Sequence, residues 1–373
     1  MDFSELLVEI SKGITAFTWG NAVMIAAGLV LIILAIVKEF EPVLLLPIGF
    51  GCILANLGMS NDHGMFKALY EAGIKTELFP LLIFIGVGAM IDFRPLLAMP
   101  RMALLGAAGQ FGIYATLLLA ILLGFPLNQA ASIGSIGAID GPTAIFVTTK
   151  LAPEILAPVT VAAYSYMSLI PIIQIPVMKL LTTRKERRIR MEYAARPVSD
   201  TVVIAFPIIV TVVISLMAPD AAPLIATLML GNLLKESGVV DRLSKAAQNE
   251  IINITTLFLG LTIGSTMTAS SFLNVQTLMI LGLGFLAFVV DTVAGLMFGK
   301  FMSFLTGGKI NPLIGACGIS AFPMAGRLAA QVAKEEDFDN FILMHAMGAN
   351  TAGQLGSVIA GGLLLALTLG FLG

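Results

Sequence analysis

Long apolar stretches recur from one end of this 373-residue chain to the other. A membrane hydrocarbon core about 30 Å thick is crossed by roughly 20 apolar residues in a helix, since lipid offers the backbone no hydrogen-bond partners. Several of the stretches are short or interrupted and need not cross; they lie near 20–37, 42–58, 77–93, 101–124, 130–150, 157–181, 200–217, 222–234, 253–270, 276–304, 311–330 and 341–372. The pattern predicts an all-α, polytopic membrane protein with about ten to twelve apolar segments.

The composition agrees with this class and excludes others. Hydrophobic residues make up 58% of the chain and charged residues 12%, which is too apolar for the surface of a soluble domain. The formal net charge of −2 gives no basic surface, so no nucleic-acid partner is expected. The two cysteines and two histidines lie far apart in sequence, which argues against a disulfide framework and against a metalloenzyme.

The densest basic run, TTRKERRIR at 182–190, separates two groups of apolar stretches. Short loops rich in Lys and Arg stay on the cytoplasmic side of a membrane, so this loop is predicted to be cytoplasmic. We therefore divide the chain into four parts: an N-terminal amphipathic lead-in at 1–19, a first membrane repeat at 20–181, the basic cytoplasmic loop at 182–199 and a second membrane repeat at 200–373.

Residues of the two halves match at an offset near 180 residues, which indicates an internal repeat. The matched pairs are Gly51 with Gly231, Gly58 with Gly238, TELF at Thr76 with TTLF at Thr255, Phe93 with Phe272, Met167 with Met347, and Gln174 with Gln354. Each match is weak alone, but one common offset favours a duplication. Membrane transporters are often built from two such repeats, with an ion site near the bilayer midplane where interrupted helices meet. We expect two related repeats, inverted relative to one another, with one interrupted segment in each.

Two glycine- and proline-rich segments are the candidates for these interruptions. They are IGSIGAIDGPTAIF at 133–146 and NPLIGACGISAFPMAGR at 311–327, and the offset places Asp140 opposite Ser320. A carboxylate at the bilayer centre costs about 2.5–3.5 kcal/mol on insertion scales, so Asp140 is by default a functional residue. A monovalent cation could use this carboxylate together with the carbonyls that a helix break releases. Alternatively, Asp140 merely caps the helix that begins near Pro142.

Neutral oxygen donors are available in the second segment and in a third cluster, GANTAGQLGS at 348–357. Asn350 and Ser357 are seven residues apart and so share one helix face. Such polar residues can instead join helices to one another. One carboxylate with neutral oxygens suits sodium or a proton better than a divalent ion.

Two further polar residues lie in apolar stretches. Tyr166, in AAYSYMSLIPIIQIP, is predicted to lie deeper than an interfacial tyrosine or on the opposite helix face. Asp291, in FVVDTVAG, fits a proton relay or a hydrogen-bonded packing role equally well.

The segments GAIDGPTAIF and NPLIGACGISAFPMAGR together resemble the membrane-embedded beta subunit of sodium-pumping biotin-dependent decarboxylases, which act on oxaloacetate, methylmalonyl-CoA, glutaconyl-CoA or malonate. The similarity extends over nearly the whole chain. It implies catalytic roles for Asp140, Tyr166 and Arg327, with Arg327 also contacting carboxybiotin. The sodium-site residues that the resemblance implies are Asp140, Asn311, Gly315, Ser320, Asn350 and Ser357.

The resemblance also implies a mechanism and partners. A carboxyltransferase alpha subunit would move a carboxyl group onto biotin of a carrier subunit or domain, since this chain shows no biotin-attachment motif. Carboxybiotin would then be decarboxylated here, consuming a proton while sodium is exported across the inner (cytoplasmic) membrane. Sodium release and proton uptake would be two sides of one titration of Asp140. A small membrane anchor subunit and a trimeric homo-oligomer complete the expected assembly.

Alternatives remain at this point. Arg327 could be a cytoplasmic anchor before the acidic stretch KEEDFDN instead of a carboxylate-binding group. A stand-alone sodium- or proton-coupled carrier of organic anions would use the same broken helices. An intramembrane aspartyl protease would need Asp140 and Asp291 to share one site, and the glycines around Asp140 do not match such proteases.

Overall fold

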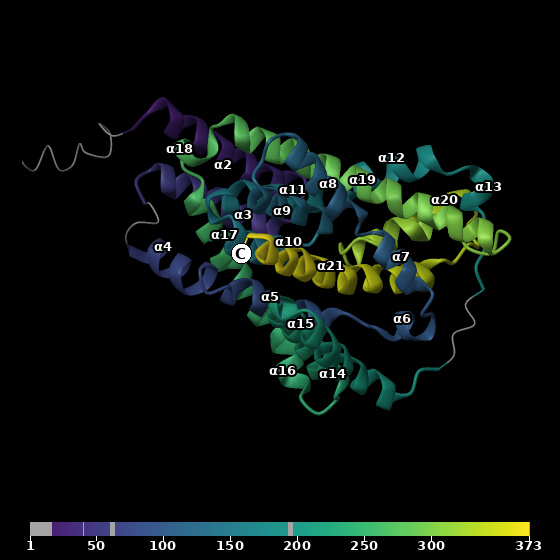
Figure 1. Cartoon of the computed structure of the whole chain (residues 1–373). Coiled ribbons are helices and arrows are strands. Elements are labelled where there is room, and N and C mark those ends of the chain that lie inside the picture. Colours follow the sequence, from purple (N-terminus) through teal and green to yellow (C-terminus); the bar gives the residue numbers. More distant parts are fainter. Residues whose placement is uncertain (1–16, 40, 60–63, 193–196, 373) are drawn as a thin grey trace, which may run out of the picture. The chain divides into compact units, whose positions relative to one another are not determined.

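The protein is helical throughout the part of the chain that its computed structural model describes, residues 17–39, 41–59, 64–192 and 197–372 (Figure 1). Nearly all of the amphipathic lead-in predicted at 1–19 lies outside these residues. The first described helix, α2 (Trp19–Val37), is N-capped by Thr18 in a capping box. The prediction of an all-α membrane protein is confirmed.

The chain divides into two compact units, and each takes segments from both sequence halves. The first unit comprises Met1–Phe79 and Asn253–Met279, and the second comprises Pro80–Ile252 and Ile280–Gly373. Compact units therefore do not coincide with the predicted repeats at 20–181 and 200–373, which stay a prediction about the sequence.

The first unit is held together by close helix contacts at small residues. Its elements are α2, α3 (Pro42–Asn56), α4 (Gly64–Leu69), η1 (Tyr70–Ile74), most of α17 (Ile252–Thr266) and α18 (Ala269–Phe272). A Cβ at Gly28 would lie 2.7 Å from the Gly49 carbonyl, and one at Gly49 would lie 2.6 Å from the Gly28 carbonyl. Helices in lipid associate through such small-residue contacts because burying apolar surface gains little there.

The second unit contains both interrupted segments. Its elements are most of α5 (Leu78–Met90), α6 (Arg94–Ala98), α7 (Met102–Ala108), α8 (Phe111–Leu122), α9 (Leu127–Gly134), η2 (Ser135–Ala138), α10 (Gly141–Leu151), η3 (Pro153–Ile155), α11 (Leu156–Ser168), α12 (Ile170–Leu181), α13 (Arg184–Arg187), α14 (Asp200–Met217), η4 (Pro219–Ala221), α15 (Ala222–Glu236), α16 (Asp241–Ala246), η5 (Ala247–Ile251), most of α19 (Val275–Leu305), η6 (Pro312–Cys317), α20 (Met324–Glu336) and α21 (Leu343–Leu372). The most buried of these surround the two breaks, and their apolar side chains form one cluster.

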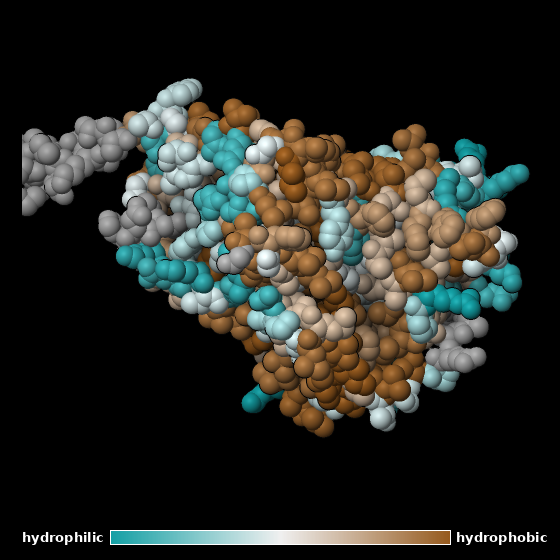
Figure 2. Space-filling model, in the orientation of Figure 1, coloured by the Kyte–Doolittle hydropathy of each residue, from teal (hydrophilic) through white to brown (hydrophobic). Residues whose placement is uncertain are grey.

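Five helices among the described residues are long and apolar enough to cross a membrane, or seven when each of two bent pairs counts as one span. This is fewer than the apolar stretches in the sequence, because several stretches are divided by glycine and proline. The stretch 130–150 forms α9, η2 and α10, and the stretch 311–330 forms η6 and α20. Apolar side chains dominate the surface seen in Figure 2.

The basic loop packs against the end of α20. Arg187 donates to the Glu336 carboxylate at 2.6 Å, and Arg190 donates to Asp337 at 2.7 Å. Hydrogen bonding to Arg187 holds the pKa of Glu336 below its ordinary value. Hydrophilic side chains gather at this end of α20 and at α13 (Figure 2). The loop is therefore fixed to the second interrupted segment.

Candidate functional site

The first interrupted segment breaks between η2 and α10. Ile139 adopts a left-handed conformation with φ 55°, and Asp140 is extended and N-caps α10. Pro142 lies in the first turn of α10, where its missing N–H costs nothing. Asp140 therefore does cap α10, but the cap uses only Oδ1, one of its two carboxylate oxygens.

Asp140 is buried, exposing 5% of its surface, and its two oxygens differ in their contacts. Oδ2 accepts hydrogen bonds from Thr143 Oγ1 at 2.9 Å, Gln354 Nε2 at 2.9 Å and Ser357 Oγ at 3.1 Å. From the described part of the chain, Oδ1 accepts only a long hydrogen bond, from the Thr143 N–H at 3.5 Å. None of the described residues forms an ion pair with Asp140. One oxygen of a buried carboxylate thus keeps acceptor capacity for a further partner.

One face of α21 contacts both breaks. Gln354 and Ser357 bind Asp140 in the first break. Asn350, one turn earlier, donates to the Ile319 carbonyl in the second break at 2.7 Å, and its own Oδ1 is buried without a hydrogen-bond partner. The prediction that Asn350 and Ser357 share a helix face agrees with this geometry, and the face points at both interrupted segments.

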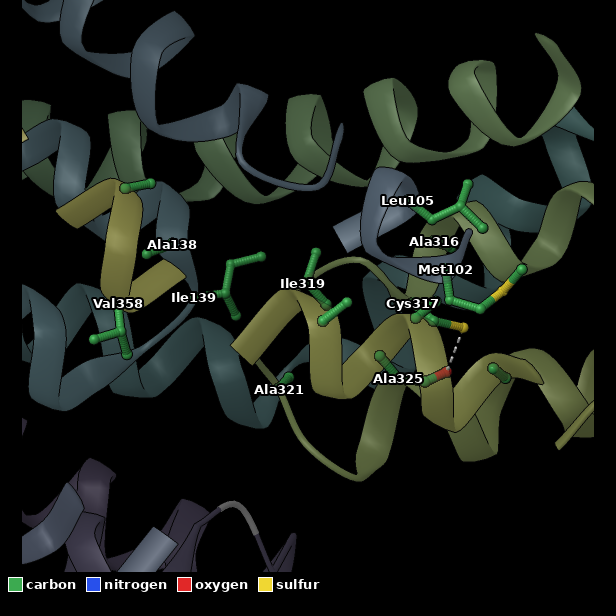
Figure 3. Close-up of a cluster of buried hydrophobic side chains, with 14 of the residues drawn as sticks. Met102, Leu105, Ala138, Ile139, Ala316, Cys317, Ile319, Ala321, Ala325 and Val358 are labelled. Atoms are coloured by element: carbon green, nitrogen blue, oxygen red, sulfur yellow. Dashed lines mark hydrogen bonds between the residues drawn. The ribbon is translucent and has the colours of Figure 1, made fainter. Parts of the chain in front are cut away.

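The second interrupted segment runs from η6 through an irregular stretch to α20. Ser320 donates to the Ala138 carbonyl of the first break, so the two breaks contact each other directly. Ile139 and Ile319 point toward one another in Figure 3, within the buried cluster. Gln110, at the junction of α7 and α8, donates to the Gly318 carbonyl at 3.2 Å. The second break therefore contacts the backbone of the first directly, and Gln110 holds the second break in turn.

Two predicted sodium ligands, Asn311 and Gly315, make contacts away from Asp140. Asn311 N-caps η6, and its Nδ2 donates to the carbonyls of Arg187 and Ile189 at 3.0 Å each. Gly315 lies against the α19 backbone, where a Cβ would collide with the Gly295 carbonyl. Asn311 therefore joins the basic loop to η6, and Gly315 permits a close helix approach. Neither makes a recorded contact with Asp140.

The predicted catalytic residue Tyr166 also makes its contacts elsewhere, on α19. Its hydroxyl donates to the Leu281 carbonyl of α19 at 2.5 Å, and its ring packs edge-on against Phe285. The neighbouring Tyr164 instead covers the first break, because a Cβ at Gly141 would collide with its ring. The structure thus brings Tyr164, not Tyr166, against the residue that follows Asp140.

Arg327 lies in the first turn of α20 and is exposed. It lines a cavity of about 470 Å³ together with Lys334, Glu335 and Phe341. Within the described residues it forms no recorded ion pair, so its guanidinium keeps its donors for an external anion.

Asp291 is fully buried in α19, away from the contacts of Asp140. Its Oδ1 accepts the Gly112 N–H at 2.9 Å. Gly112 is in the first turn of α8, where N–H groups have no intrahelical acceptor and the helix dipole favours a negative charge. Among the described residues its Oδ2 has no hydrogen-bond partner, and Asp291 shares no contact with Asp140 as a protease dyad would require.

The predicted site residues do not include Thr143, Gln354 or Tyr164, although Gln354 is one of the polar residues of the cluster at 348–357. Thr143 is three residues after the N-cap, the position whose N–H a capping carboxylate binds. Gln354 lies between Asn350 and Ser357 on the same face of α21, so helical spacing could have included it. For Tyr164 the sequence offers no signal, because only the packing of α11 on Gly141 separates it from Tyr166.

The arrangement suits a small monovalent cation or a proton. No group of three His, Cys, Asp or Glu side chains gathers among the residues described, which leaves one carboxylate and neutral oxygens around it. Divalent ions are normally held by more acidic ligands. Fold and site together define an all-helical membrane protein with a buried carboxylate at a pair of contacting helix breaks.

Comparison with known proteins identifies the family. The family model for the Na⁺-transporting oxaloacetate decarboxylase beta subunit matches residues 20–368. The chain is 53% identical to the glutaconyl-CoA decarboxylase subunit beta of Acidaminococcus fermentans, with 95% of each chain covered. It is 49% identical to the methylmalonyl-CoA decarboxylase subunit beta of Propionigenium modestum, covering 96% of this chain and 97% of that one. It is 46% identical to the oxaloacetate decarboxylase beta chain of Klebsiella pneumoniae, covering 93% and 94%.

The chain therefore belongs to the family of Na⁺-transporting oxaloacetate decarboxylase beta subunits. It is a multi-pass membrane subunit of a decarboxylase complex, and the resemblance seen in the sequence is confirmed.

Proposed function

We propose that this subunit decarboxylates carboxybiotin and uses the reaction to export sodium. The N–CO₂ bond of carboxybiotin breaks, its electron pair returns to the ureido nitrogen, and that nitrogen takes up a proton as CO₂ leaves. Biotin arrives on a carrier subunit or domain after an alpha subunit has carboxylated it. A small membrane anchor subunit and two further copies of this chain complete the complex in the cytoplasmic membrane. The sodium-transporting description of the family supports this reading.

The observation that carries the proposal is the uneven environment of Asp140. Three donors hold Oδ2, while Oδ1 has one long hydrogen bond, and no cationic side chain of the described residues pairs with the group. A charge buried in this way is costly unless a cation or proton neutralises it. Sodium binding at Oδ1 in one state and proton binding in another would meet this need in turn.

The remaining predicted residues take roles that follow from their contacts. Ser357 would bind sodium beside Asp140, and Ser320 and Asn350 would hold the second break against the first. Asn311 and Gly315 would act by positioning, Tyr166 would keep its predicted role in catalysis, and the exposed Arg327 would attract the incoming carboxybiotin. Transport further requires two states of the protein with different sodium affinities, since a ligand that binds both equally shifts neither.

Membership in the decarboxylase family favours this function over a stand-alone carrier of organic anions, which the fold alone would also allow. The test is reconstitution of the purified complex in liposomes, with free N-carboxybiotin as substrate. CO₂ release should require sodium and should drive uptake of ²²Na⁺ into the liposomes. Liposomes without protein and complexes supplied with uncarboxylated biotin are the controls. CO₂ release at an equal rate without sodium would contradict the proposal.

A further inference from the structure

A second, larger cavity lies beside the basic loop in the second unit. Its volume is about 840 Å³, within the range of small-molecule sites. Four separate parts of the chain line it, among them Arg101, Met102, Met191, Thr306, Lys309 and His345. Met191 lies in the basic loop, directly after the run TTRKERRIR, and its sulfur accepts the Asn311 N–H at 3.4 Å. The cavity thus opens on the side of the chain that the positive charges assign to the cytoplasm.

Two cations of this cavity lack the ion pairs that several other cations of the second unit make. Lys179, Arg187, Arg190 and Lys300 each form an ion pair with a carboxylate. Arg101 and Lys309 are exposed and form no recorded ion pair with the residues that the structure describes. Their positive charges therefore remain uncompensated at one cavity, which favours an anionic ligand.

The rest of the wall is mainly apolar, which limits the kind of anion. Leu97, Met99, Val202 and Ile310 contribute side chains that an inorganic ion could not contact favourably. Thr306 and Ser199 add hydroxyl groups among them. An anion with an apolar body and hydrogen-bonding edges fits this wall, and a carboxylated ureido ring fused to a thioether ring has that chemistry.

The cavity is connected to Asp140 through α21. His345 lies in the first turn of α21 and lines the cavity, while Gln354 on the same helix binds Asp140. Nine residues of helix separate them, which is about 14 Å along the axis. An occupant of the cavity and an ion at Asp140 would therefore bias the position of one helix, as coupling between two ligands requires.

We propose that this cavity binds the carboxylated ureido ring of biotin, with Arg101 and Lys309 holding its carboxylate. The inference rests on the proposed function and assigns the reaction site to a different place from the Arg327 cavity.

The test compares Arg101→Gln and Lys309→Gln with Lys185→Gln in the assembled complex. Lys185 is an exposed cation of the same basic loop and lines neither cavity. With free N-carboxybiotin, each cavity variant should raise KM about tenfold, the loss expected for one charge-assisted hydrogen bond. The sodium concentration for half-maximal rate should stay within about twofold, because a charge-assisted contact to carboxybiotin is not a contact to sodium. Lys185→Gln should leave both constants unchanged.

Three outcomes would overturn the assignment. An unchanged KM in both variants, with a raised KM in Arg327→Gln, would place the carboxylate in the other cavity. An unchanged KM with loss of a co-purifying phospholipid, seen by native mass spectrometry, would show a lipid phosphate at Arg101 and Lys309. In a Thr306→Cys variant, maleimide labelling that N-carboxybiotin does not slow would show that the ligand binds elsewhere. Cys52 and Cys317 are both buried and should not react.

Failure of the proposed function would look different. In that case the unaltered complex would release no CO₂ from N-carboxybiotin at any sodium concentration. Labelling of Thr306→Cys would then still report whether the cavity takes up the compound. Turnover in the unaltered complex without protection of Thr306→Cys would contradict only the location of the binding site.

Discussion

The two interrupted segments occupy corresponding places in the sequence, yet they do different work. The first carries a charge, and Asp140 collects donors from α10 and α21. The second is neutral, and Ser320 at the equivalent position donates to the backbone of the first break. One break thus offers a binding group and the other fixes its backbone. The two segments therefore make different contacts, one through a carboxylate and the other through a hydroxyl group.

A pair of glutamines shows the same division across the two halves. Gln174 and Gln354 are related by the 180-residue offset, and each reaches into the break of the other half. Gln174 donates to the Ala316 carbonyl at 2.6 Å, whereas Gln354 donates to the Asp140 carboxylate at 2.9 Å. The exchange of contacts is symmetrical, but only one of the two acceptors carries charge.

The largest difference between the breaks should appear on changing Asp140→Asn. Sodium-dependent decarboxylation should fall on the order of 100-fold or more, because the amide cannot neutralise a bound cation. Carboxyl transfer onto biotin by the partner subunit should remain intact. Asp291→Asn is the matched control, since Asp291 is another buried carboxylate of the same unit. Normal ²²Na⁺ transport by Asp140→Asn would show that the mechanism does not require the charge of Asp140.

An added methyl group should lower the free energy of unfolding more at the second break than at an uncrowded glycine of α19. In Gly318→Ala the new Cβ would collide with the Leu105 carbonyl, which belongs to helix backbone and cannot rotate away. We expect a loss of about 3 kcal/mol in unfolding free energy. Gly282→Ala in α19 is the control, because nothing lies within 4 Å of its Cβ and alanine favours a helix. Thermal unfolding in detergent measures both, and equal midpoints would show that the second break is loosely packed.

The smallest effects should distinguish the two serines. Ser357→Ala removes a hydrogen bond to a carboxylate and should weaken apparent sodium affinity about tenfold, whereas Ser320→Ala removes one to a carbonyl and should weaken it about threefold. Ser132→Ala is the control, since its hydroxyl bonds only within α9, to the Asn128 carbonyl at 2.9 Å. Sodium dependence of decarboxylation gives the three affinities. The reverse order would assign direct ion binding to the second break.

Much of this architecture could be predicted from the sequence. Apolar stretches must become helices in lipid, because no other partner exists for their backbone groups. Glycine and proline then mark where those helices stop, and both breaks lie where the sequence places them. A carboxylate in such a break also made Asp140 the main candidate, since burying it would be costly without a function, and the structure does bury it.

Which residues meet Asp140 was decided by tertiary structure. Spacing correctly grouped Asn350 with Ser357, because residues on one helix share a face. It could not separate Tyr164 from Tyr166, or show that Asn311 binds the basic loop while Gln354 reaches the carboxylate. Periodicity fixes the direction of a side chain about its own helix axis. Contacts between helices depend on how the helices cross, which is set by close approaches at positions such as Gly318 and Gly315.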